Sequence, residues 1–482
     1  MVAIKNSNLN GLCTVNVSAK EADVAITDST INCNDNNTTE GESYAALSLN
    51  RDAVGGKIVA TGCTVNVVEG SDSAKGRNGA ENGTVTINGS TEGVTVTVAV
   101  VTYEGSDYYY GFTSIEAAIE FAKEGDTVTL IRDVTASEIV EIKKAITLDG
   151  NGKKLTSTAA RAINVDGAKG ATIKNLIIEA SGERAINVIQ GATNVTIDNV
   201  TATAANYTVN LAGSAANAVV TIKNSDLTGL NVVNVAAANA NVTVDNTKIT
   251  CNDQNENEGY SAIATNKDAV NAVITATNVT FDIKGDSNKA KNAAAGAVIT
   301  IDGSEAEVKI AVAYVEYGNY QYSYETLAKA IAKTEAGGTI VLIRDVTIDS
   351  TLEITKDVVI DLNGKTLTTA NGYGGMSLKN NPTIKNGTIV HASNTAAIKV
   401  WNAASFENLV IDVQGKGDAN KTIGGIVLQE GSTTKVGSIK NVTIKGAALT
   451  NGIETYNCGD ATENVIGSME NVNIDAIGTG ML

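Results

Sequence analysis

Short alternations of apolar and polar residues, each closed by an asparagine, recur along this chain. One of them, Ile173-Lys174-Asn175, returns as Ile197-Asp198-Asn199, and residues 185–188 carry a similar alternation between the two. Alternation over so few positions predicts short strands with one buried face. Asparagine suits the sharp corner after each strand, because it tolerates the left-handed backbone region better than other residues that carry a side chain.

The asparagines of this pattern define a regular coil period. They stand at Asn175, Asn199, Asn224, Asn246 and Asn278, with the longest step last. A period of roughly 20–25 residues is typical of solenoids, in which each coil contacts only its neighbours. Several short strands in each period, joined by corners and loops, predict an all-β fold, a right-handed parallel β-helix.

A longer repeat is superimposed on the coil period. The segment Ile4-Lys5-Asn6-Ser7 returns at positions 222–225, and Leu130-Ile131-Arg132-Asp133-Val134 returns at positions 342–346. We therefore expect tandem modules: the C-terminal part of one at 1–101, a complete one at 102–312 and the N-terminal part of a third at 313–482. On this interpretation the chain is a segment cut from a longer protein, opening with an added methionine.

A helical pattern opens each of the last two modules, near 113–124 and near 323–336. The first begins with a Thr-x-x-Glu capping box at Thr113. Both carry apolar residues at helical spacing: Ile115, Ala118 and Ile119 in the first, Leu327, Ala330 and Ile331 in the second. We expect two short amphipathic cap helices, whose apolar faces close the exposed ends of the β-helix core.

Charge and hydropathy narrow the possible partners. The formal net charge is -17, without a basic run, which argues against binding to nucleic acid or to an anionic membrane surface. No apolar stretch reaches the roughly 18 residues of a membrane-spanning helix, so we expect no membrane insertion. The acidity instead suits the solubility of a long repetitive surface.

A second asparagine series lies within strands. Its members lie about one coil apart, at Asn164, Asn187, Asn210 and Asn234. Each stands between apolar neighbours, so we expect the amides to point outward while the neighbours point into the core. A flat face of stacked amides either binds a carbohydrate or simply covers a solvated sheet. The second interpretation is favoured.

Tyrosines gather before each expected helix: Tyr108, Tyr109 and Tyr110 before the first, Tyr320 and Tyr322 before the second. Such rings either pack the junction between two modules or form an exposed surface that stacks on sugars or on a partner protein. Junction packing is the favoured interpretation. The five tyrosines nevertheless join the four asparagines as candidate binding residues.

Polar loops are inserted where a coil lengthens. In two of these loops, acidic side chains could supply oxygen ligands to Ca²⁺: Asp35, Glu40, Asp253 and Glu258. Their spacing matches no EF-hand loop and no glycine-rich calcium repeat. We expect no cofactor, with Ca²⁺ at these loops as the alternative. Cys13 and Cys33, about one coil apart, could form a disulfide, but small buried side chains are the favoured interpretation.

The chain offers few candidates for catalysis. Hydrolysis of a glycosidic bond needs two carboxylates about 5–10 Å apart, but the sequence contains no Asp-Asp pair. Its single histidine, His391, argues against a Ser–His–Asp triad. Arg161 and Arg184 lie one coil apart, but no acidic group recurs beside them. We predict no catalytic residue.

The opening of the middle module carries a family resemblance. Residues 114–155 contain Ser-x-Glu-Ala, Gly-Asp-Thr-Val-x-Leu-x-x-Asp-Val and Ile-x-Leu-Asp-Gly-Asn-Gly-Lys-x-Leu, and residues 323–367 follow this pattern more loosely. The pattern resembles the start of pectate-lyase-like parallel β-helix repeat modules in bacterial and archaeal adhesin-like surface proteins. The resemblance implies an extracellular, cell-attached segment that lacks the catalytic residues of true pectate lyases.

Together these observations predict a non-catalytic segment of an extracellular, cell-surface protein, acting as a rigid β-helical stalk or adhesin. The expected partners are a host or cell-surface glycan or protein, or other copies of the chain. Two alternatives remain open. The first is a carbohydrate-active module that binds or cleaves a polysaccharide, and the second is a self-associating filament subunit.

Overall fold

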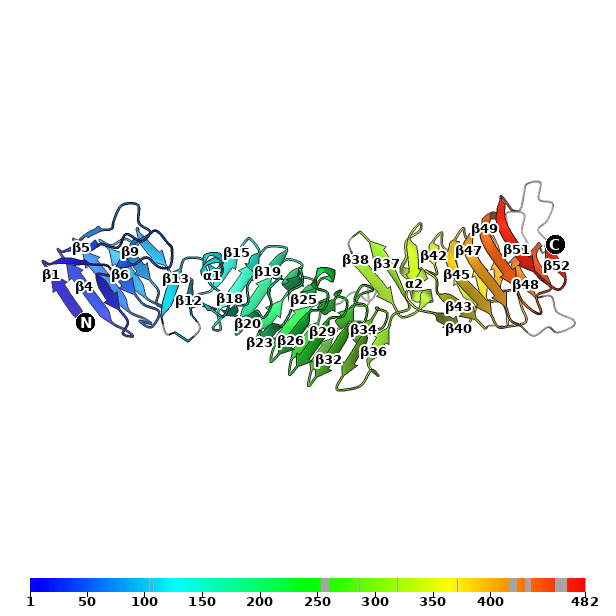
Figure 1. The fold of residues 1–482 in the computed structure, drawn as a ribbon, viewed down its shortest axis with the longest axis horizontal. Helices are drawn as coiled ribbons and strands as arrows, with labels where there is room; N and C mark the ends of the chain where they lie inside the picture. Colours follow the sequence, from blue (N-terminus) through cyan, green and yellow to red (C-terminus); the bar gives the residue numbers. More distant parts are fainter. Residues whose placement is uncertain are drawn as a thin grey trace.

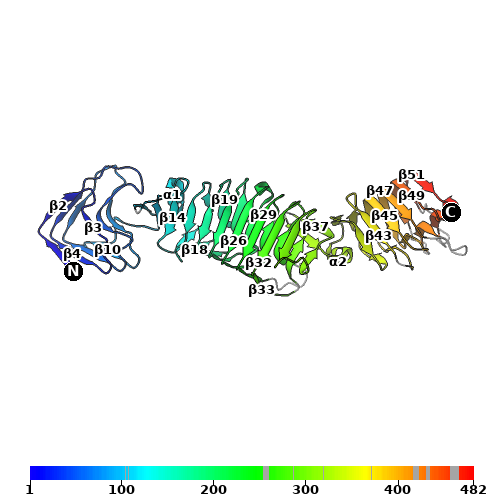
Figure 2. The ribbon, with the colours of Figure 1, turned by 60° about the horizontal axis from the view of Figure 1, so that its bottom comes forward.

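The computed structural model shows an elongated array of short strands, with the two chain ends at opposite ends of the array (Figure 1, Figure 2). The structure describes residues 1–103, 105–106, 108–252, 260–285, 287–318, 320–370, 372–415, 423–429, 435–455 and 466–481. Strands dominate these residues, and the α-helices among them are α1 (Ile115–Phe121) and α2 (Leu327–Lys333).

The N-terminal part contains three sheets of parallel strands. The first consists of β1 (Val2–Lys5), β4 (Asp23–Thr27), β7 (Lys57–Thr61) and β10 (Thr84–Ile87). The second consists of β2 (Asn8–Gly11), β5 (Thr30–Cys33) and β8 (Thr64–Asn66). The third consists of β3 (Val15–Val17), β6 (Ala45–Leu49), β9 (Ala74–Asn78) and β11 (Val94–Val96).

The middle part repeats this arrangement with longer sheets. One contains β13 (Tyr109–Phe112), β12 (Ala99–Thr102), β14 (Thr127–Leu130), β17 (Thr147–Asp149), β20 (Thr172–Lys174), β23 (Val195–Asp198), β26 (Val219–Lys223), β29 (Asn241–Asp245), β32 (Val273–Thr277) and β35 (Val298–Ile301). Another contains β15 (Val134–Ala136), β18 (Lys154–Ser157), β21 (Ile177–Ala180), β24 (Thr201–Thr203), β27 (Asp226–Gly229), β30 (Lys248–Cys251) and β33 (Thr280–Ile283). The third, here called the ladder sheet, contains β16 (Val140–Ile142), β19 (Arg161–Asp166), β22 (Arg184–Ile189), β25 (Tyr207–Leu211), β28 (Asn231–Val235), β31 (Ser261–Thr265), β34 (Asn288–Asn292) and β36 (Val308–Ile310). A short 3-10 helix, η1 (Gly213–Ala215), follows β25.

The C-terminal part has two sheets. The larger contains β38 (Tyr320–Tyr324), β37 (Ala313–Tyr317), β39 (Thr339–Leu342), β42 (Val359–Asp361), β45 (Thr383–His391), β47 (Ala403–Val413), β49 (Lys435–Lys445) and β51 (Met469–Asp475), with β40 (Val346–Ile348) and β43 (Thr366–Thr369) joined to it through β45. The smaller contains β41 (Leu352–Ile354), β44 (Met376–Leu378), β46 (Ile398–Val400), β48 (Gly424–Leu428), β50 (Asn451–Thr455) and β52 (Thr479–Met481).

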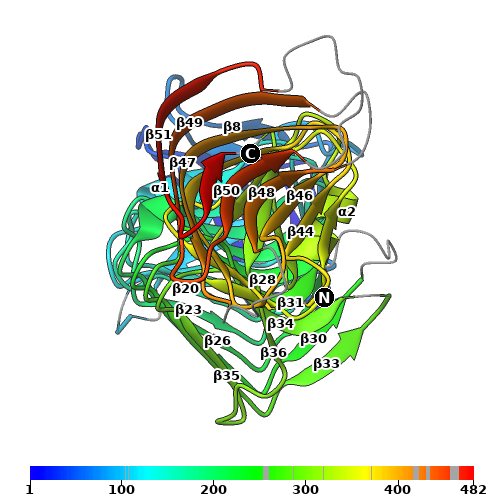
Figure 3. The ribbon, with the colours of Figure 1, turned by 90° about the vertical axis from the view of Figure 1, so that its right-hand side faces the viewer.

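Each sheet collects one strand from each successive coil. Ile173 of β20 pairs with Ile197 of β23, which in turn pairs with Ile222 of β26, and all three are fully buried. Equal side chains therefore lie above one another at the strand spacing of about 4.8 Å. Seen along the long axis, successive coils lie one behind another (Figure 3). The predicted all-β parallel β-helix is confirmed.

Antiparallel pairing marks the start of the middle and C-terminal parts. Strand β12 pairs antiparallel with both β13 and β14, and β37 pairs antiparallel with both β38 and β39. A helix follows each hairpin, and its apolar face packs on the hydrophobic core of its own module. Ile115, Ala118 and Ile119 of α1 are almost fully buried there. The predicted cap helices are therefore present at both module starts.

Both helices are shorter than the ranges predicted from sequence. The N-cap of α1 is Ser114, whose hydroxyl accepts from Ala117 N, so the predicted capping role of Thr113 is wrong. Thr113 instead donates from its backbone N and its hydroxyl to Glu40 Oε1 in the preceding module.

A lysine closes the C-terminal end of each helix. Lys144 Nζ lies 2.6 Å from Ala122 O at the end of α1. Lys356 Nζ lies 2.6 Å from Ala332 O in the last turn of α2. These ammonium groups bind the last helical carbonyls, where positive charge is favourable.

The corner asparagines behave as the sequence predicts. All five members of the first series have a positive φ, between 44° and 54°. Their amides bond along the axis, because Asn199 Nδ2 lies 2.8 Å from Asn175 Oδ1, and Asn246 Nδ2 lies 2.8 Å from Asn224 Oδ1. Asparagine thus supplies both the left-handed corner and a bond to the next coil.

This double role can be separated by substitution at Asn199, which is exposed and has a φ of 53°. Both Asn199→Gly and Asn199→Ala remove the amide bond, but only alanine is strained in the left-handed region. We expect the alanine variant to lose about 1 kcal/mol more than the glycine variant. Hydrogen exchange of the amides in β23 and β24 measures the difference. Equal losses would contradict the strained-corner explanation.

Candidate functional site

The asparagines of the ladder sheet form a continuous buried chain of hydrogen bonds. Asn187 Nδ2 lies 2.9 Å from Asn164 Oδ1, Asn210 Nδ2 lies 2.7 Å from Asn187 Oδ1, and Asn234 continues at 2.7 Å from Asn210. The four side chains are only 1–8% exposed. The expectation of a flat, solvated amide face is therefore wrong. Each amide is enclosed by the amides above and below it and by flanking side chains such as Arg184, which donates to Asn187 Oδ1.

This amide ladder has a direction and two different ends. Every Nδ2 donates toward the N-terminal coil, and the first acceptor is a carboxylate, Glu141 Oε1, at 2.8 Å from Asn164 Nδ2. At the other end the strand partner of Asn234 is Ala264, which has no amide to donate. Within the described residues, Asn234 Oδ1 is therefore the unused acceptor of the ladder.

The first junction is the place where the middle part of the chain, beginning at β12, follows the N-terminal part. Its tyrosines mostly pack between these two modules. Tyr109 accepts a hydrogen bond from Arg51 N at 3.1 Å, and the Arg51 guanidinium lies 4.3 Å from the centre of its ring. The ring of Tyr110 lies 5.3 Å from that of Phe121 in α1. Tyr108 differs, since it is 83% exposed. Packing thus accounts for two of these three rings.

The second junction is the place where the C-terminal part, beginning at β37, follows the middle part. Here Tyr322 lies against Tyr260 of the preceding module, with ring centres 6.3 Å apart. Tyr320 opens β38, and its side chain lies outside the described part of the structure. The position of Tyr109 is taken here by Gln321, whose Oε1 accepts from Lys267 N at 3.3 Å. A different side chain thus makes the same type of contact.

An arginine crosses each junction in the same way. Arg132, just after β14, donates to Thr97 O at 3.0 Å and to Ala80 O at 2.6 Å in the last coil of the N-terminal part. Arg344, just after β39, donates to Ala311 O at 3.1 Å and to Ala294 O at 2.8 Å. Both guanidinium groups satisfy backbone carbonyls that the end of a coil leaves without strand partners.

The second junction also contains a buried ion pair. Lys291 Nζ lies 3.4 Å from Glu325 Oε1 and 3.1 Å from Ser323 O, so β34 is tied to β38. Burial lowers the pKa of Lys291, although Glu325 opposes this shift. Burial would raise the pKa of Glu325, but the ammonium groups of Lys291 and Lys329 and the hydrogen bonds to the carboxylate together outweigh burial, and the pKa is lowered.

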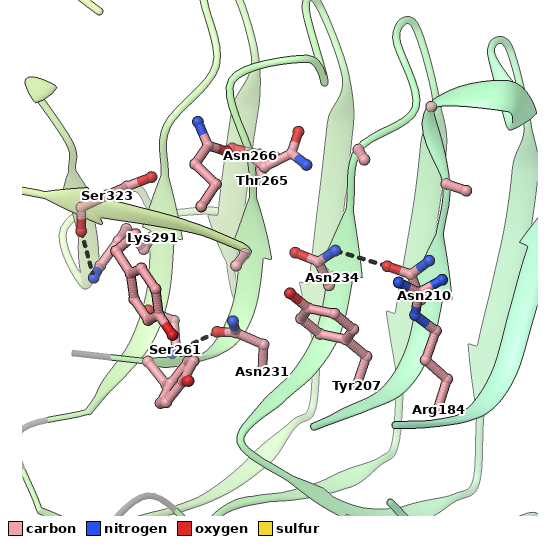
Figure 4. A pocket seen from close by; sticks show the side chains of 17 residues that line it. Arg184, Tyr207, Asn210, Asn231, Asn234, Ser261, Thr265, Asn266, Lys291 and Ser323 are labelled. Atoms are coloured by element: carbon pink, nitrogen blue, oxygen red, sulfur yellow. Dashed lines mark hydrogen bonds between the residues drawn. The ribbon is translucent and has the colours of Figure 1, made fainter. Parts of the chain in front are cut away.

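A cavity of about 250 Å³ lies at this second junction, between the ladder sheet and β38 (Figure 4). Its lining includes the ladder end, three tyrosines and two cations: Arg184, Tyr207, Asn210, Asn231, Asn234, Tyr260, Ser261, Lys291, Gln321 and Tyr322. Three buried polar atoms of this lining have no hydrogen-bond partner, namely Arg184 Nε, Ser261 Oγ and Gln321 Nε2. Unsatisfied groups of this kind are rare in folded proteins, and each calls for a partner such as a water molecule, an ion or a bound ligand.

The first junction has a corresponding cavity of about 310 Å³ with a different lining. Arg77 takes the place of Lys291, and its guanidinium is bonded to the carbonyl and the hydroxyl of Ser43. Ser48 takes the place of Ala264 beside the ladder position. None of the buried unpaired polar atoms among the described residues belongs to this lining. The second cavity is the better candidate site.

Sequence reasoning missed Ser261, Lys291 and Gln321. A signal for Lys291 was present, because a basic residue stands at the matching position of the first repeat, where Arg77 is found. Ser261 and Gln321 have no such signal, since one lies on a strand and the other in a hairpin of the following module. Only the junction brings them together.

The proposed calcium ligands have other contacts. Asp35 accepts from Tyr44 N and Asn37 N and from the hydroxyl of Ser73. Burial would raise its pKa, but these hydrogen bonds lower it. Glu40 binds the residue before the α1 N-cap, as described above.

The two remaining calcium candidates, Asp253 and Glu258, lie outside the described residues. Across the described part of the chain, no group of three or more acidic, cysteine or histidine side chains could hold a metal ion.

The structure also shows the surroundings of Cys13, Cys33 and the single histidine, His391. Cys13 and Cys33 are free thiols, and Cys33 Sγ donates to Leu12 O at 2.9 Å. His391 is fully buried between the hydroxyls of Thr369 and Thr395.

Arg161 and Arg184 lie in register on neighbouring strands, as their spacing predicts.

In the described residues, no helix is long and apolar enough to cross a membrane.

Comparison with protein-family models, with curated proteins and with solved structures gave no match for this chain. The resemblance to pectate-lyase-like modules of adhesin-like proteins therefore stays a prediction that rests on the sequence pattern alone.

The buried ion pair gives a direct test of the second junction. We expect Glu325→Gln to weaken it by about 3 kcal/mol, because the buried Lys291 ammonium loses its counter-charge. Adding Lys291→Met to the same chain is expected to restore most of that loss, since an apolar side chain can fill the space. Hydrogen exchange of the β37 and β38 amides reports both effects.

The same loss is expected in the unaltered chain at low pH. The pKa of Glu325 lies below its ordinary 4.5, so the contribution of its charge is present at neutral pH and lost as the pH falls through that lowered value. A double variant as unstable as Glu325→Gln alone would show that the pair is not what holds β38.

Proposed function

We propose that this chain acts as a rigid, non-catalytic β-helical stalk or adhesin segment of an extracellular cell-surface protein. The observation that carries the proposal is the pair of equivalent junctions, in which a hairpin, a cap helix and an arginine join one module to the next. A module boundary built in this way twice favours a continuous rod over a string of independent domains.

The coils themselves favour the same function. Strands spaced at about 4.8 Å give a ten-strand sheet a length of roughly 43 Å, and the middle part carries such a sheet. Length grows with each added coil while the core keeps a constant width, which suits a spacer. The asparagine ladders fix neighbouring coils against rotation, because each amide bonds only when the coils are in register.

The partners of such a stalk would be a host or cell-surface glycan or protein, or other copies of the chain. The acidic surface, with a net charge of -17, keeps a long array soluble and argues against nucleic acid. The junction residues themselves are largely occupied in holding the modules together. Contact with a partner would therefore use cavities and inserted loops on the rod.

Small-angle X-ray scattering tests the rigid rod. We expect the unaltered chain to scatter as a single rod with a constant cross-section. The double variant Arg132→Ala, Arg344→Ala removes the side chains that cross the two junctions, and we expect it to sample a wider range of maximum dimensions with an unchanged cross-section.

A matched control removes two cations from within coils instead. Lys174 and Lys223 pair with Asp149 and Asp198 on the surface, where such pairs contribute about 1 kcal/mol or less. We expect Lys174→Ala, Lys223→Ala to keep the rod profile. Scattering from the unaltered chain that requires freely jointed units would refute the stalk proposal.

A further inference from the structure

We propose that the cavity at the second junction binds one neutral pyranose ring of a glycan. This inference rests on the proposed stalk or adhesin function and deepens it, because it names one class of glycan and the place on the rod that binds it. It rests on the chemistry of the cavity lining: unpaired hydrogen-bonding atoms of both kinds, aromatic faces, and charges that are already neutralised (Figure 4).

The free hydrogen-bonding atoms include both donors and acceptors. Arg184 Nε and Gln321 Nε2 are N–H donors without partners, and the hydroxyl of Ser261 can donate or accept. Ser261 is only 1% exposed, and its backbone N is fixed by Asn231 Oδ1 at 3.1 Å. A ligand that satisfies this set must itself both donate and accept, which is the property of a hydroxyl group.

The ladder adds an acceptor of unusual strength. Asn234 Oδ1 ends a chain of four amides that all point the same way, starting from the carboxylate of Glu141. Hydrogen bonds in such a chain polarise one another, so the last carbonyl oxygen carries more negative charge than an isolated amide. Asn234 lines the cavity, where a hydroxyl of the ligand can donate to this oxygen.

The cations do not call for an anionic ligand. Arg184 pairs with Glu183 at 3.3 Å, and Lys291 pairs with Glu325 at 3.4 Å. Each positive charge is balanced within the protein, so a carboxylate entering the cavity would be a surplus buried charge. A neutral sugar avoids that cost. This distinguishes the expected ligand from a uronic acid.

The size and the aromatic lining fit one ring. The cavity of about 250 Å³ lies just below the range of roughly 300–1,000 Å³ typical of drug-sized ligands. Tyr207, Tyr260 and Tyr322 contribute to its wall. Aromatic rings offer apolar faces to the C–H groups of a sugar, while their hydroxyls reach its polar edge. The lining thus matches a molecule with apolar faces and a hydroxylated rim.

Saturation-transfer NMR with the full chain tests the proposal. The probes are methyl pyranosides of glucose, galactose, mannose and N-acetylglucosamine, with glucuronate as the anionic comparison. We expect transfer to at least one neutral probe and weaker transfer to glucuronate. Absence of transfer to every neutral probe, or a preference for glucuronate, would overturn the proposal.

Two variants locate the site and separate binding from folding. Ser261→Ala removes an unpaired buried hydroxyl, so we expect affinity to fall roughly tenfold while the thermal midpoint stays level or rises. Ala264→Asn extends the ladder by one amide, which would occupy Asn234 Oδ1 and fill the cavity, so we expect binding to disappear without loss of stability. Binding that survives both changes would show that the sugar lies elsewhere.

The first junction supplies the matched control. Ser48 lines the corresponding cavity there, where no buried polar atom of the described lining is unpaired. We expect Ser48→Ala to leave sugar binding unchanged, and an equal loss in this variant would overturn the assignment. Scattering from the same samples keeps the two proposals apart, because a rod that binds no sugar refutes only the site.

Discussion

The register between neighbouring coils is the constraint on which this molecule depends. A coil is stable only if its side chains fall directly on those of the next coil, about 4.8 Å away. Apolar residues then form continuous columns, as Ile173, Ile197 and Ile222 do. Asparagines form columns too, and at this spacing one amide reaches the next with good hydrogen-bond geometry. Repetition in the sequence is the direct result of this requirement.

The asparagine columns share a common direction, and this explains what stands at their ends. In the buried ladder and in the corner ladders that begin at Asn175 and Asn386, Nδ2 donates toward the N-terminal side, and the first acceptor is a carboxylate: Glu141, Asp149 and Asp361, respectively. A negative group there interacts favourably with aligned amide dipoles, as an acidic residue does at a helix N-terminus. The opposite end presents a carbonyl oxygen, which in the buried ladder belongs to a residue that lines the junction cavity.

Sequence patterns predicted the coils well and the junctions poorly. Asn199 repeats at the coil period, and its left-handed corner depends on local backbone sterics, so the corner could be predicted from the sequence. Asn187 was assigned to the correct column, but its burial depends on side chains from other coils, which alternation alone does not reveal. Lys291 and Glu325 meet because two modules dock, and nothing local in either segment encodes that contact. The capping role expected of Thr113 failed for the same reason, since a carboxylate of another module binds it.

The direction of the interstrand hydrogen bonds has a mechanical consequence. These bonds run along the long axis of the array, so a force that pulls the two ends apart loads neighbouring coils in series. Coils under such a load separate one at a time, each giving up only its own few hydrogen bonds. A coil of roughly 20–25 residues extends to about 80 Å of chain once released. The structure would thus yield under tension in steps, lengthening while the remaining coils stay folded.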